Sequence, residues 1–127
     1  MQKFCIFAYG KVEEKGEINT MANLILSAFA DEYADSFREQ LEALNGFGIR
    51  HIEVRGVDGK NVSILEKSQV LEAKKLLDDY GIKASAIGSP LGKIKIDGDV
   101  DAHFETAKKV FETANILGAK NIRMFSF

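Results

Sequence analysis

The chain has 127 residues, of which 46% are hydrophobic and 28% charged, a balance typical of a globular domain rather than a disordered segment. Its net charge of −2 argues against nucleic acid or an anionic membrane as a partner. The single cysteine, Cys5, excludes an internal disulfide framework and a multi-cysteine zinc site, and no apolar run is long enough to span a bilayer. We therefore expect a cytoplasmic protein.

The first segment of the chain does not share the pattern of the rest. The string "KFCIFAYG" is typical of a strand, and "KVEEKGEINT" is typical of a polar linker. Two interpretations are open for residues 1–21: an extension upstream of the fold, or an extra strand that covers the edge of a sheet. The sequence thus divides into residues 1–21 and a main unit over residues 22–127.

The main unit carries a repeat of helices and strands. Three segments begin with a glycine, "GIRHIEVRG" at Gly48, "GIKASAIGS" at Gly81 and "GAKNIRMFS" at Gly118, and their spacings of 33 and 37 residues suit one helix and one strand per repeat. Helical periodicity precedes each glycine, and it predicts helices capped by Ser36, Ser68 and Asp101. With the earlier strand "NLILSAFAD", the order is β-α-β-α-β-α-β, which predicts a parallel α/β sheet.

Alternation along the strands predicts which side chains face the helices, because the sheet face under the helices must be apolar. One set is expected to pack on the helices: Leu24, Leu26, Ala28, Ile52, Val54, Ile82, Ala84, Ala86, Ile122 and Met124. The opposite face is expected to carry polar and aromatic residues: Ser27, Phe29, Asp31, Glu53, Arg55, Ser85, Ile87, Ser89, Arg123, Phe125 and Phe127.

This mixed opposite face favours the interior of a barrel over a sheet with helices on both sides. A (β/α)₈ barrel takes about 250 residues, and the sequence supplies about four strands and three helices before it stops at "NIRMFSF". We therefore predict a parallel (β/α) half-barrel. The exposed inward side chains and edge strands imply either a truncated product or pairing with a second half.

Four strings of the main unit resemble a known family. "ILSAFADE", "IEVRGVDGKNV", "YGIKASAIGSPLGKIKI" and "GAKNIRMFSF" are similar, in register and in order, to the opening half of bacterial sugar phosphate isomerase/epimerase proteins, which are xylose-isomerase-like TIM barrels. The resemblance implies a divalent metal (manganese, magnesium or zinc) and a reaction between adjacent carbons of a sugar or polyol. In that family the principal metal ligands come from the second half of the barrel, so we assign this chain no metal ligand and no catalytic residue.

The residues expected to line a sugar or sugar phosphate pocket are Phe29, Glu53, Arg55, Ser89 and Arg123. Glu53 and Arg123 lie on alternate strands, which feed one interior layer of a barrel, so they either pair with each other or contact sugar hydroxyls. Arg55 is expected to bind a phosphate or carboxylate through its planar fork, or else to pair with a loop carboxylate.

Other candidates carry less specific signals. Asp31 and Glu32 could form a Mg²⁺-binding pair, but acids in the first turn of a helix are the plainer interpretation. "GSPLGK" is one residue short of a phosphate-binding P-loop. His103 is interpreted as a solvated residue in the first turn of a helix, and His51 lies near the amino end of its strand, away from the expected pocket.

Two functions from different classes follow. The first is the amino-terminal half of a metal-dependent sugar isomerase or epimerase, inactive alone and supplying residues of the pocket wall. The alternative is a non-catalytic half-barrel binding module that self-associates through its open face and edge strands. A receiver-like or flavodoxin-like domain is set aside, because the end of the third strand carries Ser89 where an acceptor aspartate would stand.

Overall fold

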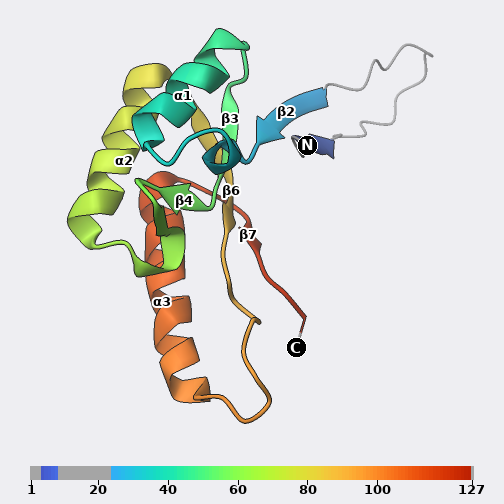
Figure 1. Cartoon of the computed structure of the whole chain (residues 1–127), viewed down its shortest axis with the longest axis vertical. Helices are drawn as coiled ribbons and strands as arrows, with labels where there is room; N and C mark the ends of the chain where they lie inside the picture. The colour runs from blue at the N-terminus through green and yellow to red at the C-terminus, as the bar shows by residue number, and fades with distance from the viewer. Residues whose placement is uncertain (1–3, 9–23, 127) are drawn as a thin grey trace, which may run out of the picture.

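The computed structural model of the chain describes residues 4–8 and 24–126 (Figure 1). Two short 3₁₀ turns, Ala30–Glu32 and Val62–Ile64, separate some of the main elements. In chain order these are β1 (Phe4–Ala8), β2 (Leu24–Ala28), α1 (Phe37–Gly46), β3 (His51–Val54), β4 (Gly56–Val57), β5 (Lys60–Asn61), α2 (Lys67–Tyr80), β6 (Lys83–Gly88), α3 (Val100–Leu117) and β7 (Ile122–Arg123). Within the described ranges, no helix has the length and apolar character needed to cross a membrane.

The main sheet has the strand order β1-β2-β3-β6-β7. Its last four strands are parallel, and each lies beside the next one along the chain. All three helices lie on the same side of this sheet in Figure 1. The predicted α/β class, with four parallel strands and three helices, is confirmed. A doubly wound sheet would instead reverse its strand order and carry helices on both faces.

The first strand covers one edge of the parallel sheet. β1 pairs antiparallel with β2, with Phe4 opposite Ala28 and Ala8 opposite Leu24. Of the two interpretations of residues 1–21, the extra edge strand is therefore the one present in the structure. The predicted linker falls in residues 9–23, outside the described residues.

Local sequence explains where the helices begin. Ser36 caps α1 as predicted, and its hydroxyl accepts a hydrogen bond from the Glu39 amide at 3.4 Å. The predicted caps Ser68 and Asp101 are wrong, because each helix begins before the predicted position. Gln69 accepts from the backbone amide of Glu66, the N-cap of α2, at 3.0 Å, and Asp99 accepts from the Ala102 amide at 2.9 Å.

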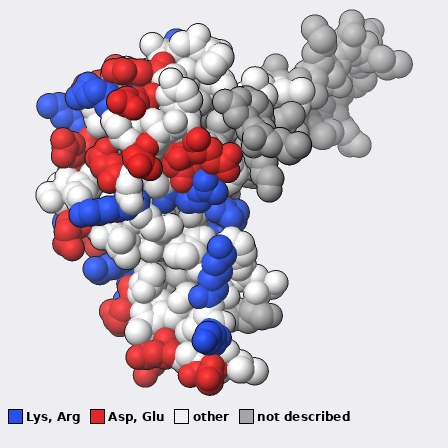
Figure 2. All heavy atoms as spheres, viewed as in Figure 1, with Lys and Arg blue, Asp and Glu red and all other residues white. Residues whose placement is uncertain are grey.

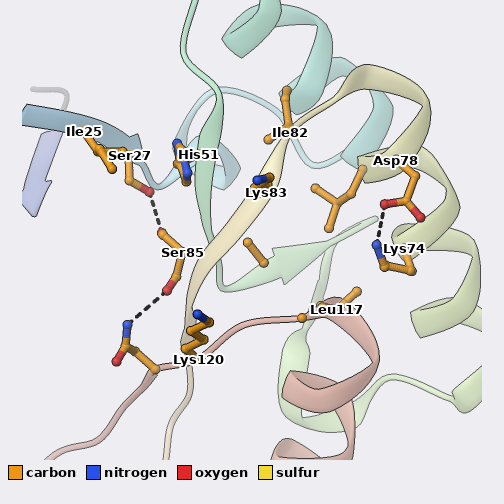
Figure 3. Close-up of a pocket in the computed structure, with 14 residues that line it drawn as sticks. Ile25, Ser27, His51, Lys74, Asp78, Ile82, Lys83, Ser85, Leu117 and Lys120 are labelled. Carbon is orange, nitrogen blue, oxygen red and sulfur yellow. Dashed lines mark hydrogen bonds and ion pairs between the residues drawn. The ribbon is translucent and has the colours of Figure 1, made fainter. Parts of the chain in front are cut away.

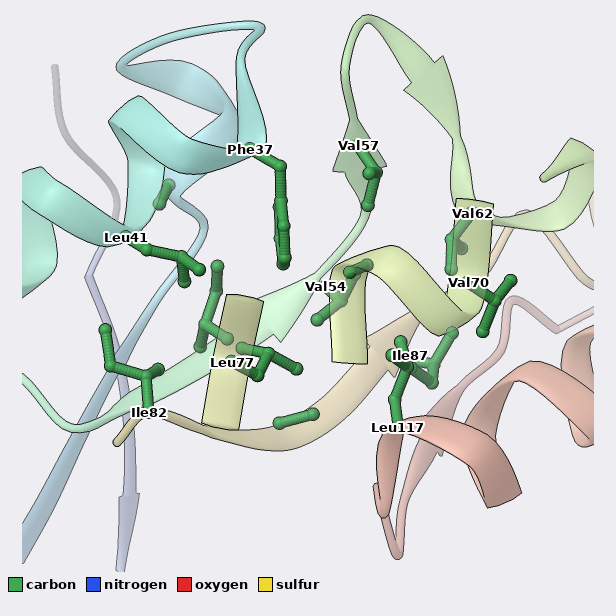
Figure 4. Packing of buried hydrophobic residues seen from close by; sticks show 14 of the residues in the cluster. Phe37, Leu41, Val54, Val57, Val62, Val70, Leu77, Ile82, Ile87 and Leu117 are labelled. Atoms are coloured by element: carbon green, nitrogen blue, oxygen red, sulfur yellow. The ribbon is translucent and has the colours of Figure 1, made fainter. Parts of the chain in front are cut away.

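The apolar core lies between the sheet and the three helices (Figure 4). Phe37 and Leu41 of α1, with Leu77 of α2, cover β3 and β6 from this side, and each is almost fully buried. Burying side chains of this size contributes about 1.5–3 kcal/mol each. The largest buried members are Phe37, Leu41, Ile52, Val54, Val62, Val70, Leu77, Ile87, Leu91 and Val110.

Two face assignments are wrong in the second half of β6, those of Ala86 and Ile87. Ile87 was expected on the helix-free face, but it is fully buried in the core beneath the helices. The cause is an irregularity in the pairing of β3 with β6, where Ile52 faces Ala84 but Glu53 faces Ala86. The extra residue, Ser85, shifts the alternation by one position, so Ile87 packs in the core and Ala86 takes the place opposite Glu53.

The ends of the outer strands also differ from prediction. Leu24 and Leu26 are exposed, because β2 pairs with β3 only through Ser27 and Ala28, and its first half extends beyond the helix layer. Met124 is exposed as well, since β7 ends at Arg123. Phe127 lies outside the described residues.

A hairpin that was not predicted follows β3. β4 and β5 pair antiparallel around Asp58 and Gly59, which both have positive φ. An Asp-Gly pair with two positive φ angles is a typical two-residue hairpin turn. The carboxylate of Asp58 accepts a hydrogen bond from the amide of Phe37 at 2.9 Å, so the hairpin also holds the start of α1.

Candidate functional site

Charged and aromatic side chains meet at the carboxyl ends of the parallel strands, on the side of the sheet that the helices leave open. We call this group the strand-end cluster; it consists of Phe29, Asp31, Glu53, Arg55, Arg123 and Phe125. Residues 29 and 31 follow β2, residues 53 and 55 end or follow β3, and residues 123 and 125 end or follow β7. In Figure 2, acidic and basic atoms border each other near the middle of the molecule.

A buried ion pair forms the centre of the cluster. The Oε1 atom of Glu53 accepts from Nε of Arg123 at 3.0 Å, and the Glu53 side chain is only 1% exposed. Arg123 is 36% exposed, so it reaches from the buried carboxylate toward solvent. The ion pair uses Nε–H, one of the five N–H donors of the Arg123 guanidinium group. The predicted proximity of Glu53 and Arg123 is therefore confirmed.

Aromatic rings flank both guanidinium groups. The ring centroid of Phe29 lies 5.3 Å from the central carbon of the Arg123 guanidinium and 5.1 Å from that of Arg55. The ring centroid of Phe125 lies 5.1 Å from the same carbon of Arg123. These distances fall within the range of favourable cation–π contacts. The cluster therefore combines charged groups with apolar ring surfaces.

Arg55 is held by acidic residues of the turn after β2. Its Nε and Nη2 atoms contact the two carboxylate oxygens of Asp31 at 2.7 and 3.0 Å, and Nη2 contacts Glu32 at 3.4 Å. The hydrogen bond that Arg55 donates to Asp31 raises the pKa of Arg55 above its ordinary value. Of the two predicted roles for Arg55, pairing with a loop carboxylate is present in the structure, so an anionic ligand would have to compete with Asp31.

Gly88 forms the floor of the cluster. A Cβ atom at this position would lie 3.0 Å from Nη2 of Arg123, 3.0 Å from Cβ of Arg55 and 3.3 Å from Oε1 of Glu53. Any side chain here would therefore push against the two arginines and the buried carboxylate. The turn of residues 88–90 was expected in the pocket wall, but the contact of Gly88 with the arginines was not, since strict alternation placed Ile87 and Ser89 on this face.

Ser89, a predicted site residue, is used by the backbone. Its hydroxyl donates to the carbonyl oxygen of Arg123 at 2.6 Å and accepts from the Leu91 amide at 3.3 Å. The residue is buried. Ser89 thus fixes the end of β6 to β7 and positions Arg123, and the structure does not direct its hydroxyl toward the cluster.

The loop after β6 packs against the segment after β7. The Phe125 amide donates to the Leu91 carbonyl at 2.8 Å, and the Lys93 ammonium lies 4.3 Å from the ring centroid of Phe125. The Gly92 amide donates to Nε2 of His103 at 3.0 Å. The interpretation of His103 as a solvated residue is therefore wrong, because its ring is partly buried and hydrogen-bonded to this loop.

The residues described do not fit a divalent metal. Over residues 4–8 and 24–126, no three His, Cys, Asp or Glu side chains lie together as metal ligands would. Asp31 and Glu32, the predicted acid pair, both contact Arg55. No step that depends on a metal can therefore be derived from these side chains.

The pKa of Glu53 links the burial of this carboxyl group to the pH dependence of stability. Burial raises the pKa of Glu53 above the ordinary 4.5, although the neighbouring Arg123 and Arg55 oppose this change. A carboxyl whose pKa rises on folding binds its proton more tightly in the folded chain. Its contribution to the free energy of unfolding is therefore largest at low pH and falls as the pH rises from 4.5 through the raised pKa.

We expect the free energy of unfolding of the wild type, minus that of Glu53→Gln, to decrease as the pH rises above 4.5 and then to level off once Glu53 is ionised. Urea unfolding followed by circular dichroism at a series of pH values measures this difference. Glu72→Gln, at an exposed position of α2, is the matched control. A difference that increases over the same interval would show that the Arg123 charge outweighs burial.

Neither a protein-family model nor a curated protein matches this sequence. The geometry of the strand-end cluster is therefore the basis on which a function can be argued.

Proposed function

We propose that residues 22–127 are the first half of a (β/α)₈ barrel of the sugar phosphate isomerase/epimerase type, and that the strand-end cluster is part of the wall of its sugar pocket. The observation that carries this proposal is the buried Glu53–Arg123 ion pair, 3.0 Å long and flanked by Phe29, on the sheet face that none of the three described helices covers. In a (β/α)₈ barrel, ligands bind at this carboxyl end of the strands.

The topology supports a half-barrel. Four consecutive parallel strands are neighbours in chain order, and their helices lie on one side, as in a barrel wall. The other side carries a charged pair that would be costly to bury against apolar groups. Such a face suits a cavity with a polar ligand better than a second layer of helices.

The chemistry of the cluster suits a sugar or polyol. Hydroxyl groups on adjacent carbons can donate to Glu53 and accept from the remaining N–H groups of Arg123, while the ring of Phe29 can pack on the C–H face of a sugar. A phosphate on the same ligand would bind beside Arg55 only by replacing Asp31, whose carboxylate now occupies the fork of that guanidinium.

In this proposal the chain positions the substrate and does not carry out the isomerisation. The described residues do not fit a metal, and the proposal assigns the metal ligands and the proton-transferring carboxylate to the other half of the barrel. We therefore propose that the isolated chain has no isomerase activity, and turnover of a ketose by the purified chain would contradict that.

Self-association of two copies remains the second candidate. Exposed apolar side chains around a groove of about 630 Å³ beside α3, among them Phe104, Phe111 and Met124, favour it. A closed barrel of two copies would also need the edge of β2, which β1 now occupies. Sedimentation equilibrium separates the candidates: a concentration-independent monomer argues against the two-copy barrel.

NMR titration with fructose 6-phosphate, fructose and inorganic phosphate tests the proposed pocket. We expect the sugar phosphate to shift the amide resonances of Glu53, Gly88 and Arg123 first, because these residues surround the buried pair. Arg55→Gln should weaken the binding of the sugar phosphate by about tenfold, because one charged contact is lost. The affinity for fructose should not change.

Arg38→Gln, at an exposed position of α1, removes the same charge away from the cluster and serves as the control. The proposal fails if the perturbed amides lie elsewhere, or if Arg38→Gln and Arg55→Gln weaken the sugar phosphate equally.

A further inference from the structure

A second cavity lies at the opposite, amino-terminal end of the strands (Figure 3). It has a volume of about 550 Å³ and reaches from the start of β6 to the turn between α3 and β7. It exists because β7 is short: the first β6 residue opposite β7 is Ile87, paired with Ile122. Among the described strands, none pairs with residues 83–86 on that side, and the cavity takes up this place. Its volume suits a small metabolite.

The charged lining of this cavity is predominantly basic. Three lysines, Lys74, Lys83 and Lys120, face a single carboxylate, Asp78, which pairs with Lys74. Among the described residues of the lining, the charges of Lys83 and Lys120 are therefore not balanced by another charged group. Coulombic attraction in a partly enclosed site would favour an anion.

His51 lies beside these lysines on the helix-free face. It is the direct neighbour of Lys83 across β3 and β6, and Figure 3 shows both side chains in the cavity wall. Burial and the positive charge of Lys83 lower the pKa of His51 below its ordinary value of 6.5. An anion bound between them would offset the charge of Lys83, so His51 reports on the occupancy of the cavity.

The rest of the cavity lining is uncharged and includes both polar and apolar side chains. The hydroxyl groups of Ser27 and Ser85 lie 2.6 Å apart, and Asn121 donates to the Ser85 carbonyl at 3.4 Å. The apolar part of the lining consists of Ile25, which is 39% exposed, and of Leu77, Ile82, Ala84 and Leu117, which are buried. A ligand that matches the basic groups and Ile25 has an anionic head and an apolar body.

We infer that this cavity binds a small organic phosphate monoester, with the phosphate held by Lys83, Lys120 and His51 and the apolar body against Ile25, which lines the cavity and is 39% exposed. The site lies at the other end of the strands from the strand-end cluster, shares no residue with it and does not depend on the proposed sugar pocket. It also gives His51, which the sequence placed away from the pocket, a role of its own.

Phenyl phosphate is a suitable probe, because it combines the two features. The chain has two histidines, and the His51 imidazole resonance can be assigned by comparison with His103→Gln. At constant ionic strength, we expect phenyl phosphate to shift this resonance saturably and to raise the pKa of His51. Inorganic phosphate should bind more weakly and phenol should have no effect, because each lacks one of the two features.

The double variant Lys83→Gln/Lys120→Gln should weaken the binding of phenyl phosphate by about tenfold or more. Lys75→Gln/Lys109→Gln changes the net charge equally at exposed positions outside the cavity and should bind as the wild type does. All four substituted lysines are exposed, so both variants should keep the wild-type thermal unfolding curve.

Equal weakening by both double variants would show only general attraction to lysines and would overturn the inference. So would a His51 pKa that is the same in phenyl phosphate and in chloride. Phenyl phosphate could instead shift the amide resonances of Glu53 and Arg123 and leave those of Ser85 and Asn121 unchanged. That result would place the phosphate in the strand-end cluster, so the failure of this site can be told apart from the failure of the sugar pocket.

Discussion

Replacing Arg123 with methionine is expected to lower the free energy of unfolding by about 3 kcal/mol at neutral pH. The substitution leaves the carboxylate of Glu53, which is 1% exposed, without its cationic partner. Breaking a buried ion pair in this way costs about 3–5 kcal/mol, and the value here is at the low end because Arg123 itself is 36% exposed and water can reach part of the site. Urea unfolding at pH 7 measures the loss.

A second substitution distinguishes the unpaired charge from lost packing. Adding Glu53→Leu to Arg123→Met removes both charges, and the double variant should recover most of the loss, since an apolar pair can replace a buried ion pair at little cost. Lys67→Met, which breaks an exposed pair with Glu112, should cost under about 1 kcal/mol. A double variant as unstable as Arg123→Met would show that packing, rather than the charge of Glu53, causes the effect.

The fold was largely predictable because its signals are local. The apolar stripe of each helix and the glycine after it depend only on nearby residues, and the structure confirms three helices and four parallel strands in the predicted order. The hairpin of β4 and β5 was missed, although Asp58 and Gly59 carry the usual signal of a two-residue turn.

The face of a side chain depends on contacts that the sequence does not show. Strict alternation placed Ile87 on the open face, and one extra residue in the pairing of β3 with β6 moved it into the core. The same shift brought Gly88 under the arginines, where no chemical signal in the sequence marks it. A bulge is set by how two strands pair, so alternation within one strand cannot reveal it.

The candidate site was predicted in part. Glu53 and Arg123 were expected to be neighbours because alternate barrel strands share a layer, and they are 3.0 Å apart. The choice of Asp31 as the partner of Arg55 was not predictable, because it depends on how the turn after β2 folds toward β3. For Ser89, the residue type suggested ligand contact, whereas the backbone of the neighbouring strand uses its hydroxyl.

Replacing Gly92 with alanine is expected to lower the free energy of unfolding by about 2–5 kcal/mol, the sum of backbone strain and overpacking. Gly92 has a φ of +89°, a conformation that L-residues adopt at a cost. A Cβ atom would also lie 1.9 Å from the carbonyl oxygen of Phe125, so the loop would have to separate from the segment after β7. That movement would break the hydrogen bond from Phe125 to Leu91.

Gly48→Ala isolates the contribution of backbone conformation, because Gly48 has a similar φ of +71° and no atom within 4 Å of a Cβ at that position. It should cost about 1–2 kcal/mol, as for a single left-handed residue. In Gly92→Ala, the amide resonances of Phe125 and Arg123 should also shift, because the loop then no longer holds the arginine of the buried pair. Equal losses of stability in the two variants would mean that the loop and the β7 segment are not in contact in solution.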